Sequence, residues 1–90
     1  MIIVRIPGGW RVHNSITDGD IKVLKTALNG LVSADYEPEM LATQVVNGTN
    51  YCFICKLRVL SPNGPEGIAK IMIYKPLAGE PIIKSIESIL

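Results

Sequence analysis

Apolar and polar side chains alternate between residues 50 and 60. The apolar positions of this alternation are Tyr51, Phe53, Cys55, Leu57 and Val59. A period of two predicts a strand that packs one face on a core. Residues 39–47 are predicted to form its antiparallel partner, because Asn47-Gly48 between the two segments favours a type I′ turn with positive φ at both residues. From its residues alone, this dipeptide is either a purely structural turn or a turn that also contacts a partner.

A second periodicity predicts a helix over residues 18–34. Thr17 is the expected N-cap, and Asp20 at position N3 supplies the other half of a capping box. Apolar residues then recur at helical spacing and form one stripe that should face the core. The members of this stripe are Ile21, Leu24, Leu28, Leu31 and Val32.

The rest of the chain divides into short segments. Residues 10–13 are a predicted short strand, and 68–74 are a longer β-rich run. Residues 61–67 and 75–81 are rich in Pro and Gly and are predicted to be loops. Residues 82–90 carry apolar side chains at helical spacing, so the pattern by itself favours a helix there.

The composition is that of one small globular domain covering residues 1–90. Apolar residues make up 48% of the chain and the mean hydropathy is +0.30, which excludes a disordered class. The net charge is only +1 and no basic stripe is present, so we expect no nucleic-acid partner. No segment reaches the roughly 20 apolar residues that cross a membrane, and no signal peptide is visible. We therefore expect no membrane association and a cytoplasmic protein as written, or a secreted one if a signal was removed.

The chain is not expected to be an enzyme. His13 is its only histidine, and no nucleophile–base pair or phosphate-binding loop is present. Cys52 and Cys55 on one strand would lie about 10 Å apart on opposite faces, beyond the roughly 7 Å limit for a disulfide. No second Cys or His pair completes a zinc site. We expect two structural thiols, and no catalytic residue, metal or cofactor.

Pro7, Gly8 and Gly9 interrupt the chain before the first predicted strand. The two glycines are either a flexible joint or a place where the backbone approaches a partner closely, which only Gly permits.

Three segments of the chain resemble the cystatins, which are reversible inhibitors of papain-like cysteine proteases. Residues 44–48, Gln-Val-Val-Asn-Gly, are similar to the Gln-x-Val-x-Gly loop of that family, and Thr-Asn-Tyr at 49–51 follows this loop in the intracellular cystatins, the stefins. Gly-Gly-Trp at 8–10 resembles the start of plant cystatins. Residues 69–77 look like the segment that enters the last hairpin, although Leu77 stands where many cystatins, but not stefins, have Trp.

The resemblance implies a cystatin-like α+β fold, with one helix packed across a four- to five-stranded antiparallel sheet. It therefore favours a strand for residues 82–90. It also implies tight, reversible binding in the cleft of a papain-like cysteine protease by a three-part wedge, within which Gln44 is expected to support the loop. The wedge residues are Pro7, Gly8, Gly9, Gln44, Val45, Val46, Asn47, Gly48, Pro76 and Leu77.

The topology implied by the resemblance brings these segments together. Successive turns of an antiparallel meander alternate between the two ends of the sheet. The turns at 47–50 and 76–80 therefore share one end, and loop 61–67 lies at the other. If strand 10–14 pairs with strand 39–47, Gly8-Gly9 falls beside Asn47-Gly48.

A function of another class remains open, namely a non-inhibitory interaction module on a cystatin-like or monellin-like fold. Such a module would bind a protein partner through an exposed sheet edge or face. Under either hypothesis we expect a monomer. A strained turn at Val45-Val46 could straighten and exchange strands between two chains, which would give a domain-swapped dimer.

Overall fold

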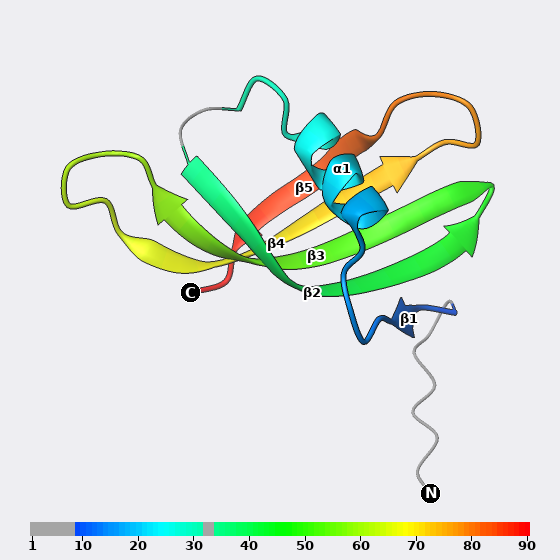
Figure 1. Cartoon of the computed structure of the whole chain (residues 1–90), viewed down its shortest axis with the longest axis horizontal. Helices are drawn as coiled ribbons and strands as arrows, with labels where there is room; N and C mark the ends of the chain where they lie inside the picture. Colours follow the sequence, from blue (N-terminus) through cyan, green and yellow to red (C-terminus); the bar gives the residue numbers. More distant parts are fainter. Residues whose placement is uncertain (1–8, 32–33) are drawn as a thin grey trace, which may run out of the picture.

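The computed structural model describes residues 9–31 and 34–90. It has one helix and five strands in these ranges, arranged as an α+β fold (Figure 1). The elements are β1 (Arg11–Val12), α1 (Asp18–Ala27), β2 (Ala34–Val46), β3 (Gly48–Val59), β4 (Glu66–Lys75) and β5 (Ile82–Ser88). This confirms the expected arrangement of one helix packed with an antiparallel sheet.

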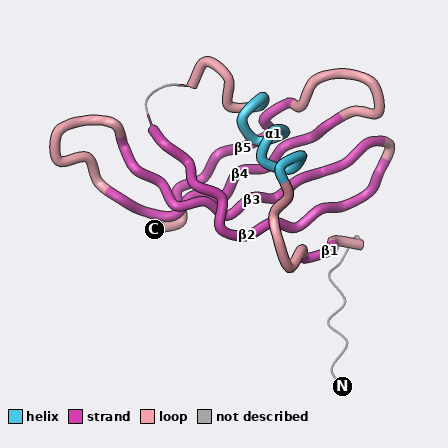
Figure 2. The backbone as a smooth tube through the Cα atoms, in the orientation of Figure 1, coloured by secondary structure: helices cyan, strands magenta, loops and turns pink. Residues whose placement is uncertain are grey.

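The sheet is a simple antiparallel meander. Its strand order is β1-β2-β3-β4-β5, so each strand pairs with its neighbour in sequence (Figure 2). The long hairpin of β2 and β3 forms the centre, with Leu41 opposite Phe53. Strand β4 continues the same row of core side chains, because Ile71 lies opposite Phe53 on its other side.

Helix α1 begins as the sequence predicts and ends earlier. The Thr17 side chain accepts a hydrogen bond from the Asp20 backbone, and the Asp20 carboxylate accepts one from the Thr17 backbone. The last turn tightens, since the Asn29 N–H donates to the Thr26 carbonyl, and Gly30 then adopts φ +89°. The predicted extension to residue 34 is therefore wrong. In the described ranges, no helix is long and apolar enough to cross a membrane.

The core lies between α1 and one face of the sheet (Figure 1). Its fully buried side chains come from the helix and three central strands. They are Leu24, Leu41, Phe53, Cys55, Ile71 and Ile73. Of the predicted helix stripe, Leu24 is buried and Leu28 packs at the edge of this cluster, whereas Leu31 is 49% exposed because the helix has ended before it. Val32 lies outside the described residues.

Strand β2 starts at Ala34, five positions before the predicted residue 39. It passes through Pro38, which has no N–H to give to a neighbouring strand. Two features accommodate this proline. The two-residue β1 pairs with β2 only at Ala42 and Thr43, so no described strand lies outside Pro38. The register also shifts there, since Pro38 faces Cys55 and Met40 faces Ile54.

Residues 82–88 form a strand, so the helix that their spacing favours is wrong and the strand expectation is confirmed. The misleading spacing has a structural cause. Ile73 pairs with Ile83 and Met72 pairs with Ser85, which leaves Lys84 as an extra residue in a β-bulge. The bulge places Ile83 and Ile86 opposite core residues although they are three positions apart, an interval typical of helices.

Truncation of two leucines tests where the helix ends. We expect Leu24→Ala to lower the free energy of unfolding by about 2–5 kcal/mol, because it empties a packed core position. Leu31→Ala should change it by no more than about 0.5 kcal/mol, because that side chain lies beyond the helix and about half in solvent. Urea unfolding of both variants measures this difference. Similar losses for the two would contradict the helix end at Ala27.

Candidate functional site

Two turns and the start of β1 meet at one end of the sheet. The β2–β3 turn and the β4–β5 loop both lie at the right in Figure 1, whereas the β3–β4 loop lies at the left. We call this end, made of Gly9, residues 44–48 and residues 76–81, the loop end. It contains all the described residues of the predicted wedge. Pro7 and Gly8 lie outside the described residues.

The β2–β3 turn is tighter than predicted. Val46 pairs directly with Gly48, so Asn47 is the one residue between the two strands. Gly48 has φ +114°, whereas Asn63 is the one non-glycine with positive φ among the described residues. Asn47 therefore lacks the positive φ that a type I′ turn requires, and that prediction is wrong. The turn uses the conformational freedom of Gly48 alone.

Gly48 also joins the two turns to each other. It is buried, and a Cβ built on it would lie 2.5 Å from the Lys75 carbonyl oxygen and 3.1 Å from the Pro76 Cα. No side chain fits in that space. The absence of a Cβ thus lets the β2–β3 turn rest directly on the backbone that enters the β4–β5 loop.

Two side-chain hydrogen bonds support the β2–β3 turn. The Tyr74 hydroxyl of β4 donates to the carbonyl oxygen of Asn47 at the tip of the turn. At the third strand pair back from the turn, the Asn50 side-chain amide donates to Gln44 Oε1 at 2.9 Å. Gln44 and Asn50 are directly opposite each other in the hairpin, so this bond ties its two strands together.

Apolar side chains protrude from the loop end into solvent. Val45 at the β2–β3 turn is 84% exposed, and Leu77 in the β4–β5 loop is 76% exposed. Val46 is also exposed, and Pro76 in the β4–β5 loop is half-buried. Exposed apolar groups gathered from separate segments are typical of a surface that binds another protein.

The start of β1 lies level with this apolar tip. Arg11 pairs with Thr43, so the antiparallel register puts Gly9 level with Val45. Hydrogen bonds hold β1 there, because the His13 N–H donates to the Leu41 carbonyl and His13 Nε2 lies 2.6 Å from Thr43 Oγ1. Gly9 has φ +74°, and no atom lies within 4 Å of where its Cβ would stand.

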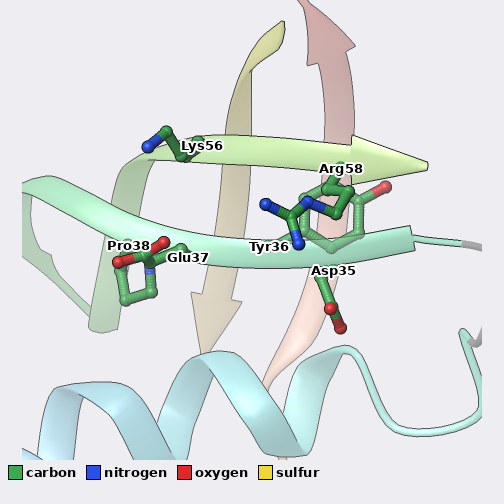
Figure 3. A pocket seen from close by; sticks show the side chains of 6 residues that line it. All are labelled: Asp35, Tyr36, Glu37, Pro38, Lys56 and Arg58. Carbon is green, nitrogen blue, oxygen red and sulfur yellow. The ribbon is translucent and has the colours of Figure 1, made fainter. Parts of the chain in front are cut away.

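The described hollows lie away from the loop end. One, of about 340 Å³, lies where β2 and β3 run side by side, as Figure 3 shows. It is lined by Asp35, Tyr36, Glu37, Pro38, Lys56 and Arg58. A second, more apolar hollow of about 470 Å³ includes Met40, Ile54, Ile68 and Leu90. Neither is lined by a wedge residue, so these two hollows do not belong to the loop end.

The two cysteines are free, as expected, and their thiols are protonated at neutral pH. Burial raises the pKa of Cys55 to about 12, with further contributions from Cys52 and Glu39. Burial also raises the pKa of Cys52, which Lys70 opposes. The thiolate is the reactive form, so neither side chain is an activated nucleophile. Across residues 9–31 and 34–90, no three His, Cys, Asp or Glu side chains are grouped to hold a metal ion.

Tyr74 and Lys75 are the residues of this end that sequence reasoning missed. Lys75 opens the predicted loop 75–81 and Tyr74 precedes it, but no local signal shows that either contacts the β2–β3 turn, which is far away in the sequence. Tyr74 and Lys75 are brought to the turn by the pairing of β3 with β4, in which Asn50 faces Tyr74 and Thr49 faces Lys75.

Neither the models of known protein families nor the curated proteins include a match to this sequence. The function must therefore be inferred from the residues of the loop end and from the motifs that they form.

A pair of glycine substitutions tests the contact between the turns. Gly48→Ala should lower the free energy of unfolding by about 2–4 kcal/mol, because alanine is strained at positive φ and its Cβ meets the Lys75 carbonyl. Gly9→Ala carries only the strain, about 1 kcal/mol, because its Cβ meets open space. Thermal and urea unfolding measure both changes. Equal losses would show that the Gly48 contact is not tight.

The buried thiols predict a loss of stability in alkali. Below pH 9.0, the ordinary value for the Cys55 thiol, the folded and unfolded chains both keep its proton. Between pH 9.0 and about 12 only the folded chain keeps it, so stability falls as the pH rises. The slope for one thiol approaches about 1.4 kcal/mol per pH unit. Urea unfolding across this range should show a shallower decline for Cys55→Ala than for the wild type, and parallel declines would contradict the assignment.

Proposed function

We propose that this chain is a reversible, tight-binding inhibitor of papain-like cysteine proteases on a cystatin-like fold. One observation carries the proposal. Three segments that are far apart in sequence, at Gly9, at 44–48 and at 76–77, converge on one end of the sheet, and the last two expose apolar side chains there. These are the described segments in which the sequence resembles the contact elements of cystatins.

The physical properties of the loop end suit a narrow cleft. Val45 and Leu77 are apolar groups that lose contact with water on insertion. The turn between them is already held by Gly48 and by the Tyr74 hydroxyl, so little conformational entropy is lost on binding. A rigid edge of this kind can bind tightly through a standard interface of about 1,600 Å².

Each segment has a separate role in this proposal. Gly9 allows close approach of the protease to the backbone, because it has no side chain and open space around it. Val45 and Val46 fill the centre of the cleft, and Leu77 supplies the third contact. Gln44 keeps the hairpin closed through its bond with Asn50. No covalent step with the protease cysteine is involved, so the inhibitor can dissociate intact.

A non-inhibitory interaction module is the competing proposal. The observation in its favour is the apolar hollow lined by Met40, Ile54, Ile68 and Leu90. This hollow shares no lining residue with the loop end. Substitutions at the two places therefore separate the two functions.

Titration of papain activity with the purified chain tests the proposal. We expect stoichiometric, reversible inhibition at micromolar concentrations or below. Val45→Glu and Leu77→Glu should each weaken it by about tenfold or more, because each buries a charge in an apolar cleft. Removal of residues 1–9 should weaken it as well. All of these changes affect exposed or terminal positions, so the fold should persist, and circular dichroism checks this.

Leu60→Glu is the matched control. Leu60 is 52% exposed but follows β3 at the opposite end of the sheet, so this variant should inhibit like the wild type. Equal weakening by Leu60→Glu and Val45→Glu would rule out the loop end as the contact surface. A folded chain that does not inhibit papain, but loses binding to a protein partner when Met40 is changed to Glu, would instead favour the interaction module.

A further inference from the structure

The peptide unit between Asn47 and Gly48 is held on both sides. On one side, its carbonyl oxygen accepts the hydrogen bond from the Tyr74 hydroxyl. On the other, the space beside the Gly48 Cα where a Cβ would stand is occupied by the Lys75 carbonyl oxygen, the Pro76 Cα and the Tyr74 ring. A peptide unit is planar, so fixing its oxygen and its following Cα fixes the direction of its nitrogen as well. The Gly48 nitrogen therefore cannot turn freely.

That nitrogen matters because Asn-Gly is a reactive dipeptide. The Gly48 nitrogen can attack the side-chain carbonyl carbon of Asn47, and the new N–C bond closes a five-membered imide. Ammonia leaves, formed from the side-chain amide and the proton given up by the Gly48 nitrogen. Water then opens the imide to aspartate or to isoaspartate. A following glycine favours the attack because no side chain shields the nitrogen.

We propose that Asn47 is a deamidation site whose rate is set by the Tyr74 hydroxyl. Asn47 is exposed, so its amide is accessible to solvent and the ammonia can leave. Attack requires rotation of the peptide plane that Tyr74 and the contacts beside Gly48 hold. Tyr74 is thus a positioning residue that keeps the turn chemically intact.

Deamidation would alter the tip of the loop end. It replaces a neutral amide with a carboxylate, and isoaspartate also adds a methylene to the main chain. Both changes act between Val46 and Gly48, where Asn47 is the only residue of the turn. An effect of these changes on protease binding rests on the proposed function, whereas the deamidation rate itself does not.

The test compares two tyrosine variants that each lose one hydroxyl. Folded wild type, Tyr74→Phe and Tyr36→Phe are incubated at neutral pH, and peptide mass spectrometry follows conversion of Asn47. Tyr74→Phe should deamidate about three- to tenfold faster than the wild type, the change expected for losing one hydrogen bond. Tyr36 lies on β2 far from the turn, so Tyr36→Phe should match the wild type. Equal rates in wild type and Tyr74→Phe would overturn the proposal.

Two further controls separate a local effect from general loss of stability. Leu24→Ala weakens the core, yet its folded form should deamidate like the wild type, because the turn stays held. If Leu24→Ala accelerates the reaction as much as Tyr74→Phe, global unfolding is the route and the proposal fails. In concentrated denaturant all variants should react at one rate, because the reacting dipeptide is the same in each.

Papain inhibition adds an independent measurement. The inhibition by fresh Tyr74→Phe is the reference for its own ageing series, and relative to that reference its inhibition should fall in step with Asn47 conversion. Faster conversion without loss of inhibition would support the role of Tyr74 and contradict the turn as a protease contact. If no variant inhibits papain, the proposed function fails, and the conversion rates still decide the role of Tyr74.

Discussion

The geometry of the loop end depends on the missing side chain of Gly48. The β2–β3 turn can rest on the Lys75 carbonyl and on Pro76 only because no Cβ stands between them. This contact sets how far Val45 lies from Leu77, two exposed apolar groups separated by 32 positions in the chain. The β2–β3 turn and the β4–β5 loop therefore form one continuous surface. The paired strands behind it provide the rigid support that short turns lack on their own.

Local sequence signals predict much of this fold. The alternation from Tyr51 to Val59 assigns the core face of β3 correctly, and Phe53 and Cys55 are fully buried. Thr17 and Asp20 mark the helix start because a capping box involves only neighbouring residues. The errors arise where strand pairing overrides local pattern. A β-bulge at Lys84 lets isoleucines at helical spacing line one face of a strand. A strand continues through Pro38 because no described strand pairs with β2 on its outer side there.

The candidate site shows the same division. Gln44 to Gly48 and Leu77 could be selected from the sequence, because they belong to short motifs beside turn signals. The residues that hold the turn could not. Tyr74 and Asn47 are 27 positions apart in the sequence. They come together only because β3 pairs with β4 in the register that places Tyr74 opposite Asn50. The type I′ prediction failed for a related reason. Gly48 has a positive φ where it packs against the backbone of Lys75 and Pro76, and Asn47 does not have one.

A short turn that must protrude faces two opposed requirements. It needs residues with little steric bulk, and Asn-Gly satisfies this need better than most pairs. The same lack of bulk leaves the Gly48 nitrogen unshielded, so that it can attack the side-chain carbonyl carbon of Asn47. Side chains within the turn cannot resolve this conflict without widening the turn. A group from a neighbouring strand can resolve it, because it restricts the peptide plane from outside and leaves the protruding surface unchanged. The Tyr74 hydroxyl occupies that position, behind the turn and bonded to its carbonyl oxygen.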